Sequence, residues 1–231
     1  MPYFYYYDPM LWAVLALALV GLIASARVQS TFRKYSQMPA RTGLRACDVA
    51  QRMLFDGGSD AQLTRVSGTL TDHFNPKTNT VGLSEAVFDQ SSVAALAVAA
   101  HEIGHVMQYQ EGYAPIRMRN ALVPVANIGS TLSPYLVLLG VLMGSYELAL
   151  FGALLFGGIL LFQLITLPVE FNASRRGIAM LSEGGYLAGN EEERAAKAVL
   201  RAAAMTYVVA ALSAFVSFLR LFFIARRSRR N

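Results

Sequence analysis

Cysteine and histidine are scarce in this chain of 231 residues. Cys47 is the only cysteine, which excludes an intrachain disulfide and any metal site built from several thiolates. It lies in a predicted amphipathic helix over residues 44–55, where a single cysteine is more often a small buried side chain than a reactive one. Any metal chemistry therefore has to come from other side chains, among them only three histidines.

Charge is scarce as well. Charged residues make up 15% of the chain and hydrophobic ones 55%, and the mean hydropathy is +0.39. Four runs carry no charged residue at all: residues 10–26, 121–146, 148–169 and 202–219. Each run is about long enough to cross the hydrocarbon core of a bilayer as a helix. The sequence therefore predicts a multi-pass membrane protein with three to four spans.

Lysine and arginine are absent before residue 10 and from residues 143–147, and they gather after the first and third runs. The positive-inside rule then predicts that residues 28–120 and 170–201 are cytoplasmic and that the amino terminus is outside the cell membrane. The aromatic residues Tyr3–Tyr7 suit an anchor at the outer interface. One question stays open, because a fully crossing fourth run would leave the last arginines outside; that run can instead stop short or lie along the interface with Arg220 snorkelling.

The net charge of +5 and the pI near 9.5 raise the question of nucleic-acid binding. The basic residues crowd beside membrane spans, however, so lipid headgroups are the expected partner and nucleic acid is not.

The strongest chemical signal is the run His101-Glu102-Ile103-Gly104-His105, inside an apolar, alanine-rich stretch. On a helix, residues four apart share a face, so both imidazoles can point at one ion while Glu102 lies beside it. Two nitrogen ligands and a carboxylate that takes a proton from water are the parts of a zinc hydrolase. The alternative is a pair of buried histidines flanking a glutamate, but an unpartnered glutamate on an apolar helix is costly.

The segment around this motif predicts a small mixed α+β domain. We expect a strand over residues 63–70, a loop over 72–76, a strand over 80–84 and a helix over 91–110 capped by Ser91 or Asp89. The full division is an amino-terminal anchor (1–27), this domain (28–120), a membrane hairpin (121–169), a cytoplasmic segment (170–201) and a final membrane helix with a basic tail (202–231).

A zinc site needs a third protein ligand, and Glu170 is the best candidate. It lies at the predicted cytoplasmic end of the third run, on the same side as His101 and His105, where a carboxylate is a functional candidate. Other acidic residues lie at a helix end, across the membrane or in charged segments: Glu111, Glu147, Glu183 and Glu191–Glu193. The alternative for Glu170 is an ion pair with Arg175 or Arg176.

Several runs carry a family resemblance: residues 98–106 (VAAHEIGHV), residues 168–176 (PVEFNASRR), residues 70–76 (LTDHFNP) and Leu83-Ser84. Together they resemble the YugP-type membrane zinc metallopeptidases over most of the chain. The resemblance implies a zincin-like cytoplasmic domain fused to an α-helical membrane bundle. It implies one Zn²⁺ held by His101, His105 and Glu170 in a zincin of the glutamate type, with Glu102 as general base.

Two positions depart from what broader relatives lead one to expect. Ser174 stands where an aspartate often orients a ligand histidine, which predicts weaker support for that ligand. Gly177 stands where alanine is expected, which predicts a looser ligand helix.

The hydrogen-bond donor for the oxyanion is not fixed by the sequence. His73 is the first catalytic candidate, followed by Arg175, Arg176 and Tyr186; the alternative for His73 is a loop residue bonded locally. Zincins usually keep an edge strand beside the metal helix, so an extended peptide is expected to pair with the strand around residues 81–83.

The predicted function is zinc-dependent endopeptidase activity at the membrane surface, acting on membrane or misfolded proteins. One alternative is a zinc-binding scaffold without proteolysis, which an intact Glu102 argues against. Another is a transporter, which the nearly charge-free spans argue against. Small residues in the second and third runs allow contacts with another membrane protein or a second copy, although packing within one chain is the favoured interpretation.

Overall fold

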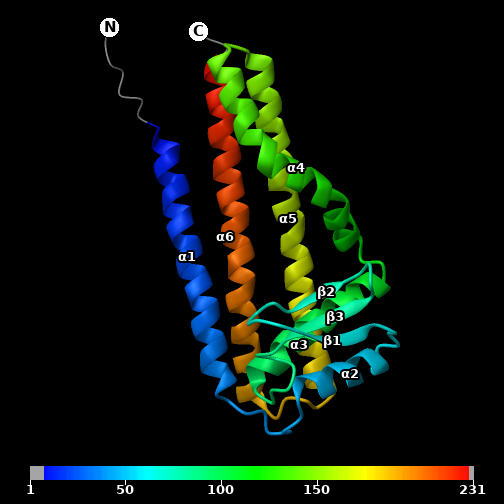
Figure 1. Ribbon diagram of the computed structural model, residues 1–231. Helices are drawn as coiled ribbons and strands as arrows, with labels where there is room; N and C mark the ends of the chain where they lie inside the picture. The colour runs from blue at the N-terminus through cyan, green and yellow to red at the C-terminus, as the bar shows by residue number, and fades with distance from the viewer. Residues whose placement is uncertain (1–7, 229–231) are drawn as a thin grey trace. The chain divides into compact units, whose positions relative to one another are not determined.

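A computed structural model describes residues 8–228. The chain is mostly helical with one small sheet (Figure 1), so the predicted combination of helices and a short sheet is found. The elements are α1 (Pro9–Ser36), α2 (Ala46–Asp56), β1 (Gln62–Val66), β2 (His73–Asn75), β3 (Thr80–Ser84), α3 (Val93–Gln110), α4 (Ala114–Leu142), α5 (Tyr146–Glu183) and α6 (Asn190–Ser228). The predicted anchor Tyr3–Tyr7 lies outside the described residues.

The chain divides into two compact units. We call the first the helical unit: among the described residues it contains 8–23, Met118–Leu167 and 206–228. The second, the mixed unit, contains Ala24–Arg117 and Pro168–Met205. Helices α1, α4, α5 and α6 each contribute residues to both units.

Within residues 8–228, four helices are long and apolar enough to cross a membrane, namely α1, α4, α5 and α6. This agrees with the four uncharged runs of the sequence. The fourth run lies within α6, which is one continuous helix to Ser228. Within the helical unit, Arg220 on α6 donates from Nε to the Asp8 carboxylate at 2.8 Å, so its charge is paired at the start of α1.

The α4–α5 hairpin of the helical unit is packed through small residues. A Cβ atom added to Gly152 would lie 2.8 Å from the backbone nitrogen of Val137, and one added to Gly140 would clash with Ala149. The buried Ser133 hydroxyl donates to the Gly152 carbonyl at 2.8 Å. These glycines therefore contact their own chain, as expected for close packing of membrane helices.

The sheet of the mixed unit has the order β1-β3-β2, with β1 parallel and β2 antiparallel to β3. The prediction of a loop over residues 72–76 was wrong at its centre, because residues 73–75 form β2. The prediction that the strand around residues 81–83 lies at an edge of the sheet was also wrong. Strand β3 lies in the middle with both sides paired, so an incoming peptide has no free backbone edge there, and β1 and β2 form the edges.

Helix α3 packs against β2, β3 and α2 in the core of the mixed unit. Apart from the half-buried Val98, its run of alanines and branched apolar residues is buried, which explains why the helix is apolar on almost every side. Ser92 caps its first turn by accepting from the backbone nitrogen of Ala95 at 3.3 Å. The predicted caps Ser91 and Asp89 were thus wrong, by one and three residues. Cys47 on α2 is buried, as expected.

Candidate metal centre

Helices α3 and α5 come together through two glycines of the mixed unit. A Cβ atom on Gly177 of α5 would lie 2.7 Å from the Ala100 carbonyl oxygen, and one on Gly104 of α3 would approach the Ala173 carbonyl oxygen even more closely. The absence of side chains at both positions allows the backbones to touch. Gly177, which stands where alanine was expected, therefore permits close contact with the helix of the histidines.

This close contact brings three polar side chains to one point. Nε2 of His101 lies 3.3 Å from Oε2 of Glu170, and Nε2 of His105 lies 3.7 Å from the same oxygen. All three ligand atoms lie within 4.8 Å of one another. Among the described residues, these three form the cluster of histidine, cysteine and acidic side chains suited to a metal ion, and His73 is not part of it.

The cluster fits zinc in both donor type and spacing. Zinc bonds of about 2.0–2.2 Å at tetrahedral angles place ligand atoms roughly 3.4 Å apart, close to the two histidine–glutamate separations. Two imidazoles and one carboxylate suit zinc, whereas Mg²⁺ and Ca²⁺ prefer oxygen ligands. Glu170 is 3% exposed, and a carboxylate this deeply buried needs positive charge beside it.

Glu102 lies on the same helix between the two histidines and is buried. Burial raises the pKa of its carboxyl group, and the nearby carboxylates of Asp72 and Glu170 raise it further, while the imidazoles of His101 and His105 act against them. A carboxylate with a raised pKa accepts a proton more readily, which is what a general base requires.

His105 is supported by a buried amide. Its Nδ1 lies 3.0 Å from Oε1 of Gln108, and Nε2 of Gln108 donates to the Val169 carbonyl at 2.7 Å and to Oδ1 of Asn172 at 2.9 Å. Gln108 is completely buried, so these bonds are shielded from water. One side chain of α3 thus contacts His105 and the segment of α5 that carries Glu170.

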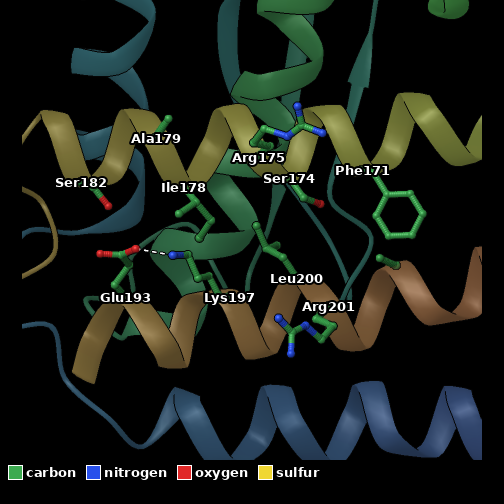
Figure 2. Close-up of a pocket in the computed structure, with 11 residues that line it drawn as sticks. Phe171, Ser174, Arg175, Ile178, Ala179, Ser182, Glu193, Lys197, Leu200 and Arg201 are labelled. Carbon is green, nitrogen blue, oxygen red and sulfur yellow. Dashed lines mark hydrogen bonds and ion pairs between the residues drawn. The ribbon is translucent and has the colours of Figure 1, made fainter. Parts of the chain in front are cut away.

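His101 has a different support. Its Nδ1 lies 3.2 Å from the Ser174 hydroxyl, at the position where an aspartate was expected. Ser174 also lines a cavity of about 460 Å³ between α5 and α6, in which Figure 2 shows it together with Phe171, Ile178 and Leu200. At the far end of this cavity, Lys197 is paired with Glu193. The support of His101 therefore borders an open space.

His73 lies on β2 and is exposed. Its Nδ1 lies 2.9 Å from the Thr71 carbonyl oxygen, which only accepts hydrogen bonds, so the Nδ1 position carries the proton. The preceding residue, Asp72, is tied to β3 by bonds from the Ser84 nitrogen at 2.7 Å and the Ser84 hydroxyl at 3.0 Å. Burial raises the pKa of this carboxyl group.

The other donor candidates lie in different surroundings. Arg176 donates from Nε to Asn172 at 2.8 Å and from its two terminal nitrogens to Glu111 at 2.6 and 2.7 Å. Each of its three nitrogens therefore already makes a hydrogen bond. Tyr186 is buried in the core of the mixed unit, and Arg175 lines the cavity beside Ser174.

The comparisons with known proteins agree with this centre. The family described as "Putative neutral zinc metallopeptidase" matches residues 10–226. The chain belongs to this family. It is also 43% identical over 223 residues to the "Putative membrane protease YugP" of Bacillus subtilis, covering 95% of this chain and 99% of that protein. No solved structure matches the chain.

Membership of a zinc metallopeptidase family implies zinc, and the cluster of His101, His105 and Glu170 is where the described residues can hold it. Sequence reasoning did not single out Gln108 or Asn172. A signal for Gln108 was present, because it follows His105 by three residues on the same helix face, in a stretch otherwise too apolar to want an amide. Asn172 had no comparable signal.

Proposed function

We propose that this protein is a membrane-embedded, zinc-dependent endopeptidase of the glutamate type of zincins. The observation that carries the proposal is the convergence of His101, His105 and Glu170 within 4.8 Å, with the buried Glu102 between the two histidines. A structural zinc site needs no such base, and structural sites are usually closed by a fourth protein ligand. The cluster has three, which leaves one position for reacting groups.

The chemistry follows from the positions of these side chains. Zinc, when bound, supplies a Lewis acid that activates water near neutral pH and polarises a carbonyl group. Glu102 accepts a proton from the attacking water and later delivers it to the leaving nitrogen of the peptide. Its buried surroundings favour the first of these steps, because they raise the affinity of the carboxylate for the proton.

The substrate we propose is an extended stretch of polypeptide that pairs with β2. Strand β2 is an edge strand, and it packs against α3, the helix of the two histidines. Backbone pairing at such an edge recognises extended chains with little sequence preference. His73 on this strand remains our candidate for the oxyanion donor. Because Nδ1 carries the proton toward Thr71, Nε2 donates only when the ring is an imidazolium.

We further propose that the protein is a multi-pass protein of the cell membrane with the metal centre on the cytoplasmic side. The four apolar helices support the membrane location, as does the name of the Bacillus relative. The basic residues that follow the first and third apolar runs support the orientation. Membrane proteins with damaged or flexible cytoplasmic segments are the substrates within reach of such a site.

The decisive experiment compares the purified wild type with Glu102→Gln. We expect the variant to keep about one zinc per chain and to lose roughly 10²–10⁴-fold in the rate of cleavage of an unfolded protein such as casein, since proton transfer is worth that much. The matched control is Glu85→Gln on the exposed surface, which should cleave at the wild-type rate. Glu111→Gln would be a poorer control, because Glu111 binds Arg176. Equal cleavage by Glu102→Gln and the wild type would leave the scaffold alternative.

A further inference from the structure

The bonds around His105 continue away from the metal centre as one chain of side chains. It runs from Arg176 to Asn172, from Asn172 to Gln108, and from Gln108 to His105. We propose that Arg176, Asn172 and Gln108 are positioning residues, which together fix the tautomer of His105 and hold the helix of Glu170 in place. This inference rests on the proposed zinc centre, but it does not depend on proteolysis.

The direction of every bond in the chain follows from its first member. The Arg176 guanidinium only donates, so the Asn172 atom 2.8 Å away must be its oxygen. That oxygen then accepts from Gln108, which places the amide nitrogen of Gln108 toward α5. The Gln108 oxygen is left facing His105, so His105 must carry its proton on Nδ1.

A proton on Nδ1 leaves the lone pair of Nε2 free in the neutral imidazole, and Nε2 is the atom that faces Glu170 at 3.7 Å. The neutral ring is thereby held in the tautomer that binds a metal through Nε2. The polarity is set at Arg176, whose terminal nitrogens are fixed by two bonds to Glu111 at 2.6 and 2.7 Å.

The second bond of the Gln108 nitrogen acts on the other ligand. It joins the Val169 carbonyl, one residue before Glu170, at 2.7 Å. The amide oxygen of Gln108 therefore fixes the ring of His105 on α3, and its amide nitrogen fixes the backbone beside Glu170 on α5. In metalloproteins, such outer groups typically contribute 10–100-fold to metal affinity.

The test measures zinc affinity by competition with a chelator, and the visible absorption spectrum of the Co²⁺-substituted protein. Gln108→Met keeps the size of the side chain and removes every bond, so we expect 10–100-fold weaker zinc binding and an altered Co²⁺ spectrum. Gln108→Glu should also weaken zinc binding, because a carboxylate would face the Val169 carbonyl and the Asn172 oxygen. Asn172→Asp should bind zinc within about threefold of the wild type, since a carboxylate accepts both bonds as the amide oxygen does.

If Gln108 and Asn172 served only in packing, Gln108→Glu and Asn172→Asp would change zinc affinity to the same extent. Glu192→Gln is the matched control: it alters a buried side chain of the mixed unit that is bonded to the backbone nitrogens of Arg41 and Ala188. It should affect unfolding but neither zinc affinity nor the Co²⁺ spectrum. Wild-type zinc affinity and spectrum in Gln108→Met would overturn the proposal.

Equal losses in Asn172→Asp and Gln108→Glu would overturn it too, and this pair still decides if Gln108→Met fails to fold. A wild type that binds zinc but cleaves nothing would refute the proposed peptidase and leave this inference to be judged on affinity alone.

Discussion

The surroundings of His105 and His101 differ, although Nε2 of both rings faces the same oxygen of Glu170. His105 is held by the completely buried Gln108, whose orientation is fixed by further bonds to α5. His101 is held by the Ser174 hydroxyl, which borders an open cavity. A hydroxyl both donates and accepts, so it sets no tautomer, whereas the amide oxygen of Gln108 only accepts.

We infer that the candidate metal centre has one histidine, His105, whose geometry is imposed, and one, His101, whose geometry can adjust. The imposed side lies where α3 and α5 are tied through Gln108. The adjustable side faces the cavity between α5 and α6, where a hydroxyl can rotate without breaking a buried network. Variants that act on both histidines at once should therefore have the largest effects on zinc binding.

Glu170→Ala removes the group that both histidines share. We expect zinc content to fall from about one per chain to a small fraction of that, because two imidazoles alone do not complete a site that needs three protein ligands. Elemental analysis of the detergent-purified protein measures this directly. Glu147→Ala on the same helix is the control and should keep its zinc, since it lies in the first turn of α5 and outside the ligand cluster. Full zinc occupancy in Glu170→Ala would mean that another residue supplies the third ligand.

The ligand pair on α3 is the part of this centre that could be predicted from the sequence, because helical periodicity alone places residues four apart on one face. Glu170 was found by its position at the end of an apolar run. The bonds from Gln108 to Val169 and Asn172 were not predicted, since they depend on the distance between α3 and α5, and no local pattern encodes that distance. It became visible only with the close contacts at Gly104 and Gly177.

The sheet, too, could be predicted from the sequence only in part. Residues 80–84 have the β-branched and apolar pattern of a strand and form β3, whereas β2 has three residues in a sequence typical of a turn. Its pairing is established by β3 and by the bonds of Asp72 to Ser84, which join residues twelve positions apart. The central position of β3 depends on tertiary pairing, so the local sequence pattern does not predict it.

Gly104→Ala tests whether the contact between the helices serves both ligands. The new methyl group would press on the Ala173 carbonyl, between the supports of the two histidines. We expect a loss of about 1–3 kcal/mol in the free energy of unfolding from overpacking, partly offset by about 1 kcal/mol of helix propensity. Denaturant unfolding with and without zinc measures it, and zinc affinity should fall as well.

Gly21→Ala is the control for this change, because its Cβ would meet only Val209 Cγ1, at the ordinary contact distance of 3.8 Å. It should leave zinc affinity unchanged. If Gly104→Ala and Gly21→Ala bind zinc equally well, α3 and α5 can separate without consequence for the metal centre. The contact between these helices would then not serve both histidines.

The smallest effect on zinc binding is expected at Ser174, where one substitution should weaken the support of His101 and another should strengthen it. Ser174→Ala should weaken zinc binding by less than about tenfold, below the loss in Gln108→Met, because only one adjustable bond is removed. Ser174→Asp should strengthen zinc binding, since a carboxylate accepts from Nδ1 of His101 and imposes the tautomer that Gln108 imposes on His105. The cavity beside Ser174 has room for the larger side chain, and Ser182→Asp in the same cavity wall controls for the added charge. Weaker binding in Ser174→Asp than in Ser174→Ala would show that the His101 side is constrained by its packing and not by the weakness of its hydrogen bond.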